Sequence, residues 1–263
     1  TTTVVYYDWE TMGVPVEGQV GVRGNVANMI AYLGKDDVNA GVIFSPDTPN
    51  DEFLVVRETL REFYYFYVLT HIGFTRIRPD ENMMEGEMNE REALQAELLE
   101  AYDKFRTKVW RKKDRWMEGM MEYMKNNDDS VPHILSTSLQ EAVETEWKDF
   151  RNVVTTLASH PPGGPLVKLQ APRIIAIALN AAKFDTQFFL DYIGQQSDSH
   201  WSYTEDGLVQ SGNKILTLTL QAKLYKAFRG TQAVIKRPYN AAAKLVFCDT
   251  VAFLPASLMK LVK

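Results

Sequence analysis

The sequence predicts an α/β or α+β fold, in which strands near the two ends of the chain enclose a long helical block. Before residue 50, β-branched and aromatic residues form short apolar runs, as in buried strands. Residues 50–165 show helical periodicity and many charges, and strand-like runs return after residue 165. This order of elements predicts a mixed sheet with a large helical insertion between its strands.

The first predicted strand is Thr2–Tyr7, with the sequence TTVVYY. The segment Asp8–Gly13 that follows indicates the end of the strand and a turn. Two further apolar runs, Val26–Leu33 and Val38–Phe44, are separated by a short polar stretch that starts with glycine. This spacing predicts a hairpin or a meander.

Apolar residues then recur at steps of three and four from Asp51 to about Ile72, which predicts a helix. Asn50 or Asp51 is expected to cap it. Residues 81–126 are rich in Glu, Lys, Arg and Met, and we expect one or two long charged helices there. A further helix is predicted from about Ser138 to Leu157.

The segment His160–Pro165, with three prolines and two glycines, is the strongest loop signal in the chain. It divides the sequence into 1–49 (first part of the sheet), 50–165 (helical insertion) and 166–263 (second part of the sheet). The last part contains the remaining predicted elements, which are strands at Arg173–Leu179, Lys214–Leu220 and Leu245–Cys248 and helices at Ala182–Ile193 and Ser257–Val262.

The net charge of −5 hides an asymmetry. Residues 1–150 carry 28 acids and 16 bases, whereas residues 151–263 carry 6 acids and 13 bases. A basic second half suits a protein that meets a polyanion on one side, and an uneven solvated surface is the alternative. Apolar runs are too short to cross a bilayer and no secretory signal opens the sequence, so no membrane is expected. The single cysteine, Cys248, excludes a disulfide framework and favours an intracellular setting.

Three acidic residues lie where predicted strands or helices meet turns. Asp8 and Glu10 are two apart on a strand, so both carboxylates point to the same face. Asp185 follows another buried strand, in the first turn of a predicted helix. Clustered carboxylates suit Mg²⁺ or Mn²⁺, and two such ions support phosphodiester hydrolysis. Taken singly, the same residues also fit a solvated turn and a helix cap.

Three stretches together resemble a known family. Val4–Gly13 is similar to the first motif of DEDD-type 3′–5′ exonucleases, a strand that ends in Asp-x-Glu-Thr, and Ile177–Leu190 is similar to the second motif. Leu245–Leu261 resembles the strand, Asp-Ser/Thr turn and Ser-Leu helix of family B DNA polymerases, and the protein-primed branch is most similar. The resemblance covers about residues 2–45 and 172–263.

The resemblance implies a ribonuclease H-like sheet and proofreading of DNA 3′ ends. It implies that Asp8, Glu10 and Asp185 bind Mg²⁺ or Mn²⁺. The residues expected to hold a single-stranded 3′ end are Thr11, Asn180 and Phe184, and core packing is the alternative role of Phe184. Ser257 and Leu258 would contact single-stranded DNA and a terminal, priming protein, and Thr250–Leu254 is a looser match to the same element.

The sequence departs from the family pattern at two points. Leu179 stands where histidine is usual, and neither Tyr-x₃-Asp nor His-x₄-Asp occurs in residues 186–263. We therefore expect the N-terminal part of a longer polymerase, with the fourth acid beyond Lys263. The alternative is a nuclease fold that binds a priming protein or nucleic acid without cutting. A third alternative is a mostly helical protein with accidental motif matches, which predicts no sheet between Val4–Asp8 and Ile174–Leu179.

The segment Lys104–Trp116 contains seven bases and two tryptophans. Interleaved bases and aromatic rings suit a nucleic-acid strand. A charged, solvated helix is the alternative, because many acids precede the segment.

Overall fold

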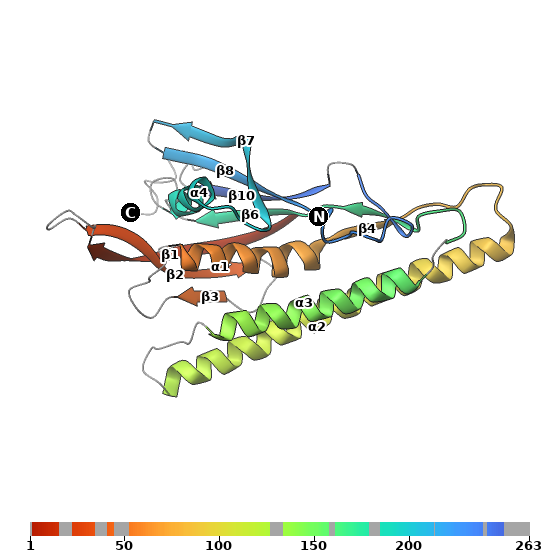
Figure 1. Cartoon of the computed structure of the whole chain (residues 1–263), viewed down its shortest axis with the longest axis horizontal. Helices are drawn as coiled ribbons and strands as arrows, with labels where there is room; N and C mark the ends of the chain where they lie inside the picture. Colours follow the sequence, from red (N-terminus) through yellow and green to blue (C-terminus); the bar gives the residue numbers. More distant parts are fainter. Residues whose placement is uncertain are drawn as a thin grey trace, which may run out of the picture.

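A computed structural model describes residues 2–15, 23–34, 41–44, 53–126, 134–157, 161–178, 185–212, 214–238 and 241–249. They form a seven-stranded mixed sheet, a three-stranded sheet and helices that include a long helical hairpin (Figure 1). The predicted mixed α/β class is confirmed, because strands from before and after the helical block join one sheet.

The large sheet has the strand order β3-β2-β1-β6-β10-β8-β7. These strands are β1 (Thr2–Pro15), β2 (Arg23–Gly34), β3 (Gly41–Phe44), β6 (Arg173–Ala178), β7 (Trp201–Ser211), β8 (Lys214–Lys223) and β10 (Ala242–Asp249). The central strands β1, β6 and β10 are parallel, and the outer strands are added antiparallel. Ile175 of β6 pairs with Val4 of β1 on one side and with Val246 of β10 on the other. This pairing contradicts the alternative of a mostly helical protein.

Helices cover one face of the large sheet. On β1, Val5, Tyr7 and Trp9 are buried, whereas Asp8 between them is exposed, as strand alternation requires. The buried face packs against α4 (Asp185–Gln195) and against α1 (Leu54–Glu62) with its continuation. That continuation consists of a π-helical turn, η1 (Phe63–Val68), and a 3₁₀ turn, η2 (Leu69–His71).

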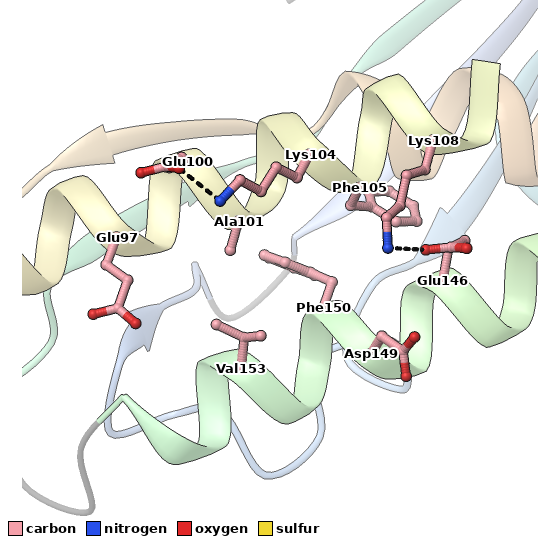
Figure 2. Close-up of a pocket in the computed structure, with 10 residues that line it drawn as sticks. All are labelled: Glu97, Glu100, Ala101, Lys104, Phe105, Lys108, Glu146, Asp149, Phe150 and Val153. Atoms are coloured by element: carbon pink, nitrogen blue, oxygen red, sulfur yellow. Dashed lines mark ion pairs between the residues drawn. The ribbon is translucent and has the colours of Figure 1, made fainter. Parts of the chain in front are cut away.

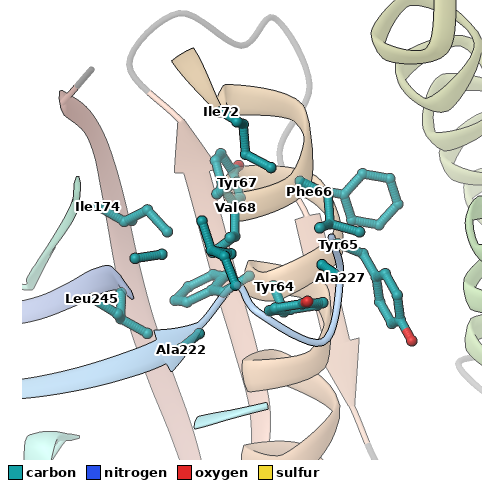
Figure 3. Packing of buried hydrophobic residues seen from close by; sticks show 14 of the residues in the cluster. Tyr64, Tyr65, Phe66, Tyr67, Val68, Ile72, Ile174, Ala222, Ala227 and Leu245 are labelled. Carbon is teal, nitrogen blue, oxygen red and sulfur yellow. The ribbon is translucent and has the colours of Figure 1, made fainter. Parts of the chain in front are cut away.

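The six residues of η1 are all buried, and they fill the space between the sheet and the helical hairpin. Figure 3 places Val68 of η1 beside Ile174 and Leu245 of the central strands, whereas Phe66 points away from them. On that other side, Phe66 and Tyr67 contact Trp110 of the hairpin, each at a centroid distance of 5.9 Å. The apolar core therefore continues from the sheet into the hairpin.

The hairpin consists of α2 (Glu85–Asn126) and α3 (Ile134–Thr156), which run side by side (Figure 1). Buried residues recur at steps of three and four along both helices, as expected for an apolar stripe. They are Leu98, Tyr102, Phe105 and Val109 on α2 and Val143, Trp147, Phe150 and Val154 on α3. No helix within the described residues is long and apolar enough to span a membrane.

The small sheet joins β4 (Gly73–Arg76), β5 (Val167–Gln170) and β9 (Ile235–Lys236). Beside it, the buried guanidinium of Arg91 donates hydrogen bonds to the carbonyl oxygens of Pro162, Gly164 and Pro165, at 2.6–2.9 Å. Gly163 and Gly164 have φ angles of +68° and +79°, which favour glycine. The predicted loop is therefore tied to the first third of α2.

Several predicted elements need correction. The turn expected at Asp8–Gly13 is wrong, because β1 continues to Pro15 and pairs with β2 through a bulge at Glu10/Thr11. Phe53 stands at the N-cap position of α1 and makes no side-chain cap hydrogen bond, whereas the predicted caps Asn50 and Asp51 lie outside the described residues. The structure also adds strands that the sequence analysis did not predict, namely β4, β5, β7 and β9. The helix predicted at Ser257–Val262 lies outside the described residues.

Candidate acidic site at the carboxyl end of the sheet

β6 and β10 end together at one edge of the large sheet, where the parallel pairing of β1 with β6 also stops while β1 itself continues to Pro15. Asp249 is the last residue of β10 and pairs with Ala178, the last residue of β6. Asp8 lies two residues beyond Tyr6 of β1, which pairs with Ile177 of β6. Asp185 is the first residue of α4, the helix that follows β6 along the chain. The topology therefore brings Asp8, Asp185 and Asp249 to the same edge.

The electrostatics of Asp185 support this placement. Burial, then the negative charge of Asp8, then that of Asp249 raise the pKa of Asp185 from its ordinary value of 3.8 to about 6. Like charges near a carboxylate favour its protonated form. The charges of Asp8 and of Asp249 therefore each disfavour the ionised form of Asp185.

The three aspartates of this edge differ in their exposure to solvent. Asp8 is exposed, Asp185 is partly buried, and Asp249 is only 3% exposed.

An aromatic cluster fixes α4 against the strands that carry the acids. Phe189 of α4 is fully buried. Its ring centroid lies 4.1 Å from that of Phe247 on β10, 5.3 Å from that of Trp9 and 6.0 Å from that of Tyr7 on β1. Because Asp185 is one helical turn before Phe189, this packing sets the position of its carboxylate relative to Asp8.

The remaining predicted residues are only partly accounted for. Glu10 and Thr11 lie in β1, next to the bulge, and Glu10 pairs with Met29 of β2, but the side chains of Glu10 and Thr11 are outside the described part of the chain. The residues Asn180, Phe184, Ser257 and Leu258, and the alternative Thr250–Leu254, also lie outside it. The structure thus brings Asp8 and Asp185 together, and the other assignments remain predictions.

Asp249 is the acid that the sequence analysis missed. That analysis placed it at the end of a strand and in the Asp-Ser/Thr turn of the Leu245–Leu261 stretch, without naming it as part of the acidic site. The available signal was the similarity to Asp8: in both places an aspartate directly follows an apolar run, and the next strand along the sheet is parallel.

The donor chemistry fits a hard divalent cation. Carboxylate oxygens are the ligands that Mg²⁺ and Mn²⁺ prefer, and Asp8 and Asp185 supply them from two elements. Among the described residues, no group of three or more His, Cys, Asp or Glu side chains stands close enough to hold a metal ion. The side chain of Glu10, the third predicted ligand, is not among those residues.

The groove between α2 and α3 is a second hollow, with a volume of about 290 Å³. Its floor is apolar, and its rim carries both charges in ion pairs, Lys104 with Glu100 at 2.6 Å and Lys108 with Glu146 at 3.0 Å (Figure 2). Lys112 also pairs with Glu146, at 3.1 Å. The bases of the Lys104–Trp116 segment are therefore partly neutralised, which favours the charged-helix interpretation over nucleic-acid binding.

Comparisons with models of known protein families, with curated proteins and with solved structures found no match.

Proposed function

We propose that this chain is the 3′–5′ exonuclease domain of a protein-primed family B DNA polymerase, which removes mismatched nucleotides from the 3′ end of single-stranded DNA. The observation that carries the proposal is that Asp8, two residues beyond the part of β1 that pairs with β6, lies close enough to Asp185, the first residue of α4, for its charge to raise the pKa of Asp185, although the two are far apart in the sequence. These are the two acids that the family motifs single out. Their juxtaposition is an outcome that an accidental match would not predict.

The architecture supports the same proposal. Three parallel central strands, with an antiparallel strand beside β1, are consistent with the ribonuclease H-like sheet that the resemblance implies. The long hairpin α2–α3 lies in the chain between β3 and β6, as expected for a helical insertion into such a sheet.

In this proposal, Asp8, Glu10 and Asp185 hold Mg²⁺ or Mn²⁺. When bound, these ions lower the pKa of a coordinated water and stabilise the charge that develops on the leaving oxygen. The aromatic cluster below α4 keeps Asp185 in place. Thr11, Asn180 and Phe184 would orient the terminal nucleotide, with Phe184 offering a stacking face. Asp249 would raise the negative charge of the edge and so favour cation uptake.

The experiment is digestion of a 5′-labelled single strand with Mn²⁺ and with EDTA. It compares residues 1–263 with a chain that continues past Lys263. The proposal predicts metal-dependent shortening by the longer chain, because the fourth acid is expected beyond Lys263. An absence of shortening by the longer chain in Mn²⁺ would contradict it.

A second candidate function is a nuclease fold that binds without cutting, as a scaffold for a priming protein or a nucleic acid. It is favoured by the missing third motif in residues 186–263. The same experiment separates the two, because a scaffold would bind the strand and leave its length unchanged in both chains.

A further inference from the structure

Basic residues are concentrated at the end of the large sheet opposite to the edge that carries Asp8, Asp185 and Asp249. Residues 207–248 contain seven bases and no acid. Five of these bases lie within a short segment that joins β8 to β10, namely Lys223, Lys226, Arg229, Lys236 and Arg237. Lys223 pairs with Ala242 at the start of β10, whereas Asp249 ends that strand. At the rise of an extended strand, the two ends are roughly 23 Å apart.

The segment between β8 and β10 is anchored to the rest of the fold, so its lysine and arginine side chains project from a fixed surface. Leu224 and Phe228 are buried, and the hydroxyl of Thr231 donates to the Phe228 carbonyl at 2.8 Å. The Arg237 guanidinium donates to the Tyr225 carbonyl at 3.1 Å. Arg151 of α3 holds the same segment by donating to the Arg229 carbonyl at 2.6 Å.

One lysine of the small sheet, Lys168, adds to this charge beside Lys236, which is already counted. Lys168 of β5 and Lys236 of β9 are neighbours in the parallel register, and both are exposed. Like charges on adjacent strands are unfavourable unless an opposite charge lies near them. No ion pair within the described residues joins either lysine to an acid. An anionic partner would relieve this repulsion.

Two lysines of the segment between β8 and β10, Lys223 and Lys226, line a hollow of about 210 Å³. Tyr225 lines the hollow beside them and is 50% exposed. The stacked rings of Tyr64 and His200, with centroids 4.1 Å apart and planes at 3°, also line it. Burial lowers the pKa of His200, so the positive charge of the hollow comes from the lysines.

One acid, Asp198, also lines the hollow, and hydrogen bonds fix the position of its carboxylate. Asp198 accepts hydrogen bonds from the backbone N–H groups of His200 and Trp201, at 2.7 and 2.8 Å, and from the Tyr192 hydroxyl at 2.9 Å. The charge of a second acid, Glu144, raises the pKa of His200, and the Glu144 carboxylate accepts a hydrogen bond from the Tyr65 hydroxyl. The charge of Arg61, like burial, lowers the pKa of His200, and the Arg61 guanidinium pairs with Glu58 at 2.9 Å.

We propose that this surface binds single-stranded nucleic acid, with Lys223 and Lys226 on backbone phosphates and a base stacked on the exposed ring of Tyr225. We define this basic face as Lys168, Lys223, Tyr225, Lys226, Arg229, Lys236 and Arg237. Lysine and arginine neutralise phosphates, and aromatic rings stack on bases of any sequence. The exposed ring of Tyr225 lies next to Lys223 and Lys226, for which the described part of the chain shows no ion pair, and this combination favours a nucleic acid over an acidic protein. The basic face shares no residue with the site of Asp8, Asp185 and Asp249. Binding to the basic face does not depend on metal binding or catalysis at that site.

The test is fluorescence anisotropy of a 5′-labelled 20-nucleotide oligo-dT in EDTA, over a series of salt concentrations. EDTA prevents digestion, so binding is read alone. The double variant Lys223→Gln/Lys226→Gln should bind about tenfold more weakly at low salt and lower the slope of log K against log[salt] by about 1.4. Tyr225→Ala should weaken binding about fivefold or more and leave the slope unchanged.

Lys214→Gln is the matched control, because Lys214 is an exposed lysine at the other end of β8. This variant should bind the oligonucleotide as tightly as the unaltered chain does. The charge-conserving Lys223→Arg/Lys226→Arg should restore binding. Wild-type affinity and slope in the double glutamine variant would overturn the proposal, as would binding of polyglutamate in place of oligo-dT. Asp8→Ala should bind normally in EDTA, so a failure of the nuclease proposal and a failure of this one give different results.

Discussion

Asp185 and Asp8 share one edge of the sheet, and their charges interact across a large separation in the sequence. After burial, the charge of Asp8 is the next largest cause that raises the pKa of Asp185 to about 6. A fold that places repelling carboxylates together sacrifices stability, and such sacrifices concentrate at functional sites. This repulsion has measurable consequences.

The first prediction concerns stability without metal. Because the pKa of Asp185 is raised on folding, the folded state binds more protons than the unfolded state between about pH 4 and 6. The contribution of this group to stability is therefore lost as the pH rises through that range. In EDTA at pH 8, Asp185→Asn should raise the melting temperature by about 2–4 °C. Asp191→Asn, on the same helix, is the control, and equal melting temperatures for all three chains would contradict the prediction.

The second prediction concerns the pH dependence of Mn²⁺ binding. Below about pH 6 a proton competes with the cation for Asp185, so affinity should fall by up to about tenfold per pH unit. Above pH 7 it should level off. Isothermal titration in buffers of different ionisation enthalpy would detect the released proton. A constant affinity from pH 5 to 8 would mean that Asp185 is not a ligand.

A third prediction concerns the aromatic support of the site. Phe189 is fully buried, and its ring meets Tyr7, Trp9 and Phe247. Phe189→Ala should lower the free energy of unfolding by about 3–5 kcal/mol. Phe188 is only partly buried, and Phe188→Ala should cost clearly less. Urea unfolding of the two variants compares them directly, and similar losses would show that α4 is not anchored through Phe189.

A fourth prediction concerns the contact between η1 and the hairpin. Burial raises the pKa of Glu62 to about 7, and the charge of Lys113 acts in the opposite direction. The Lys113 ammonium lies 5.0 Å from the ring centroids of Phe66 and Trp110. Because the folded-state pKa is raised, the contribution of Glu62 to stability is lost as the pH rises from about 4.5 to about 7.

Glu62→Gln should therefore flatten the pH dependence of the free energy of unfolding over that range, by about 1–3 kcal/mol. Urea unfolding at pH 5, 6, 7 and 8 measures it. Glu118→Gln, an exposed acid of α2, should leave the dependence as it is in the unaltered chain. A Glu62→Gln curve parallel to that of the unaltered chain would exclude this role.

The central strands and the long helices were predictable from the sequence because their burial leaves a pattern. β1, β6 and β10 are apolar runs that lie at the centre of the sheet, and α2 and α3 repeat their buried residues at helical steps. The short strands β4, β5 and β9 have two to four residues, which is too few for a periodic signal. β7 is an edge strand that contains the polar stretch Thr204–Gly207, so its sequence resembles that of a loop.

The acidic site was predictable only in part. Asp8 and Asp185 were identified because each belongs to a recognisable motif. Asp249 was not, because its role depends on the parallel pairing of β10 with β6, and no local pattern reports which strands will be neighbours. The basic face was predictable only as a basic second half of the chain and a basic turn at Lys236 and Arg237, since Lys168 and Lys236 come together only through the pairing of β5 with β9.

The central claim is that Asp8 and Asp185 act together in 3′–5′ digestion. Its most direct test is digestion of a 5′-labelled single strand in Mn²⁺ by a chain that continues past Lys263, carrying Asp8→Ala, Asp185→Ala or the control Asp191→Ala. We predict that the first two variants lose digestion by at least about a hundredfold, whereas Asp191→Ala digests normally. Undiminished digestion by either Asp8→Ala or Asp185→Ala would contradict the claim.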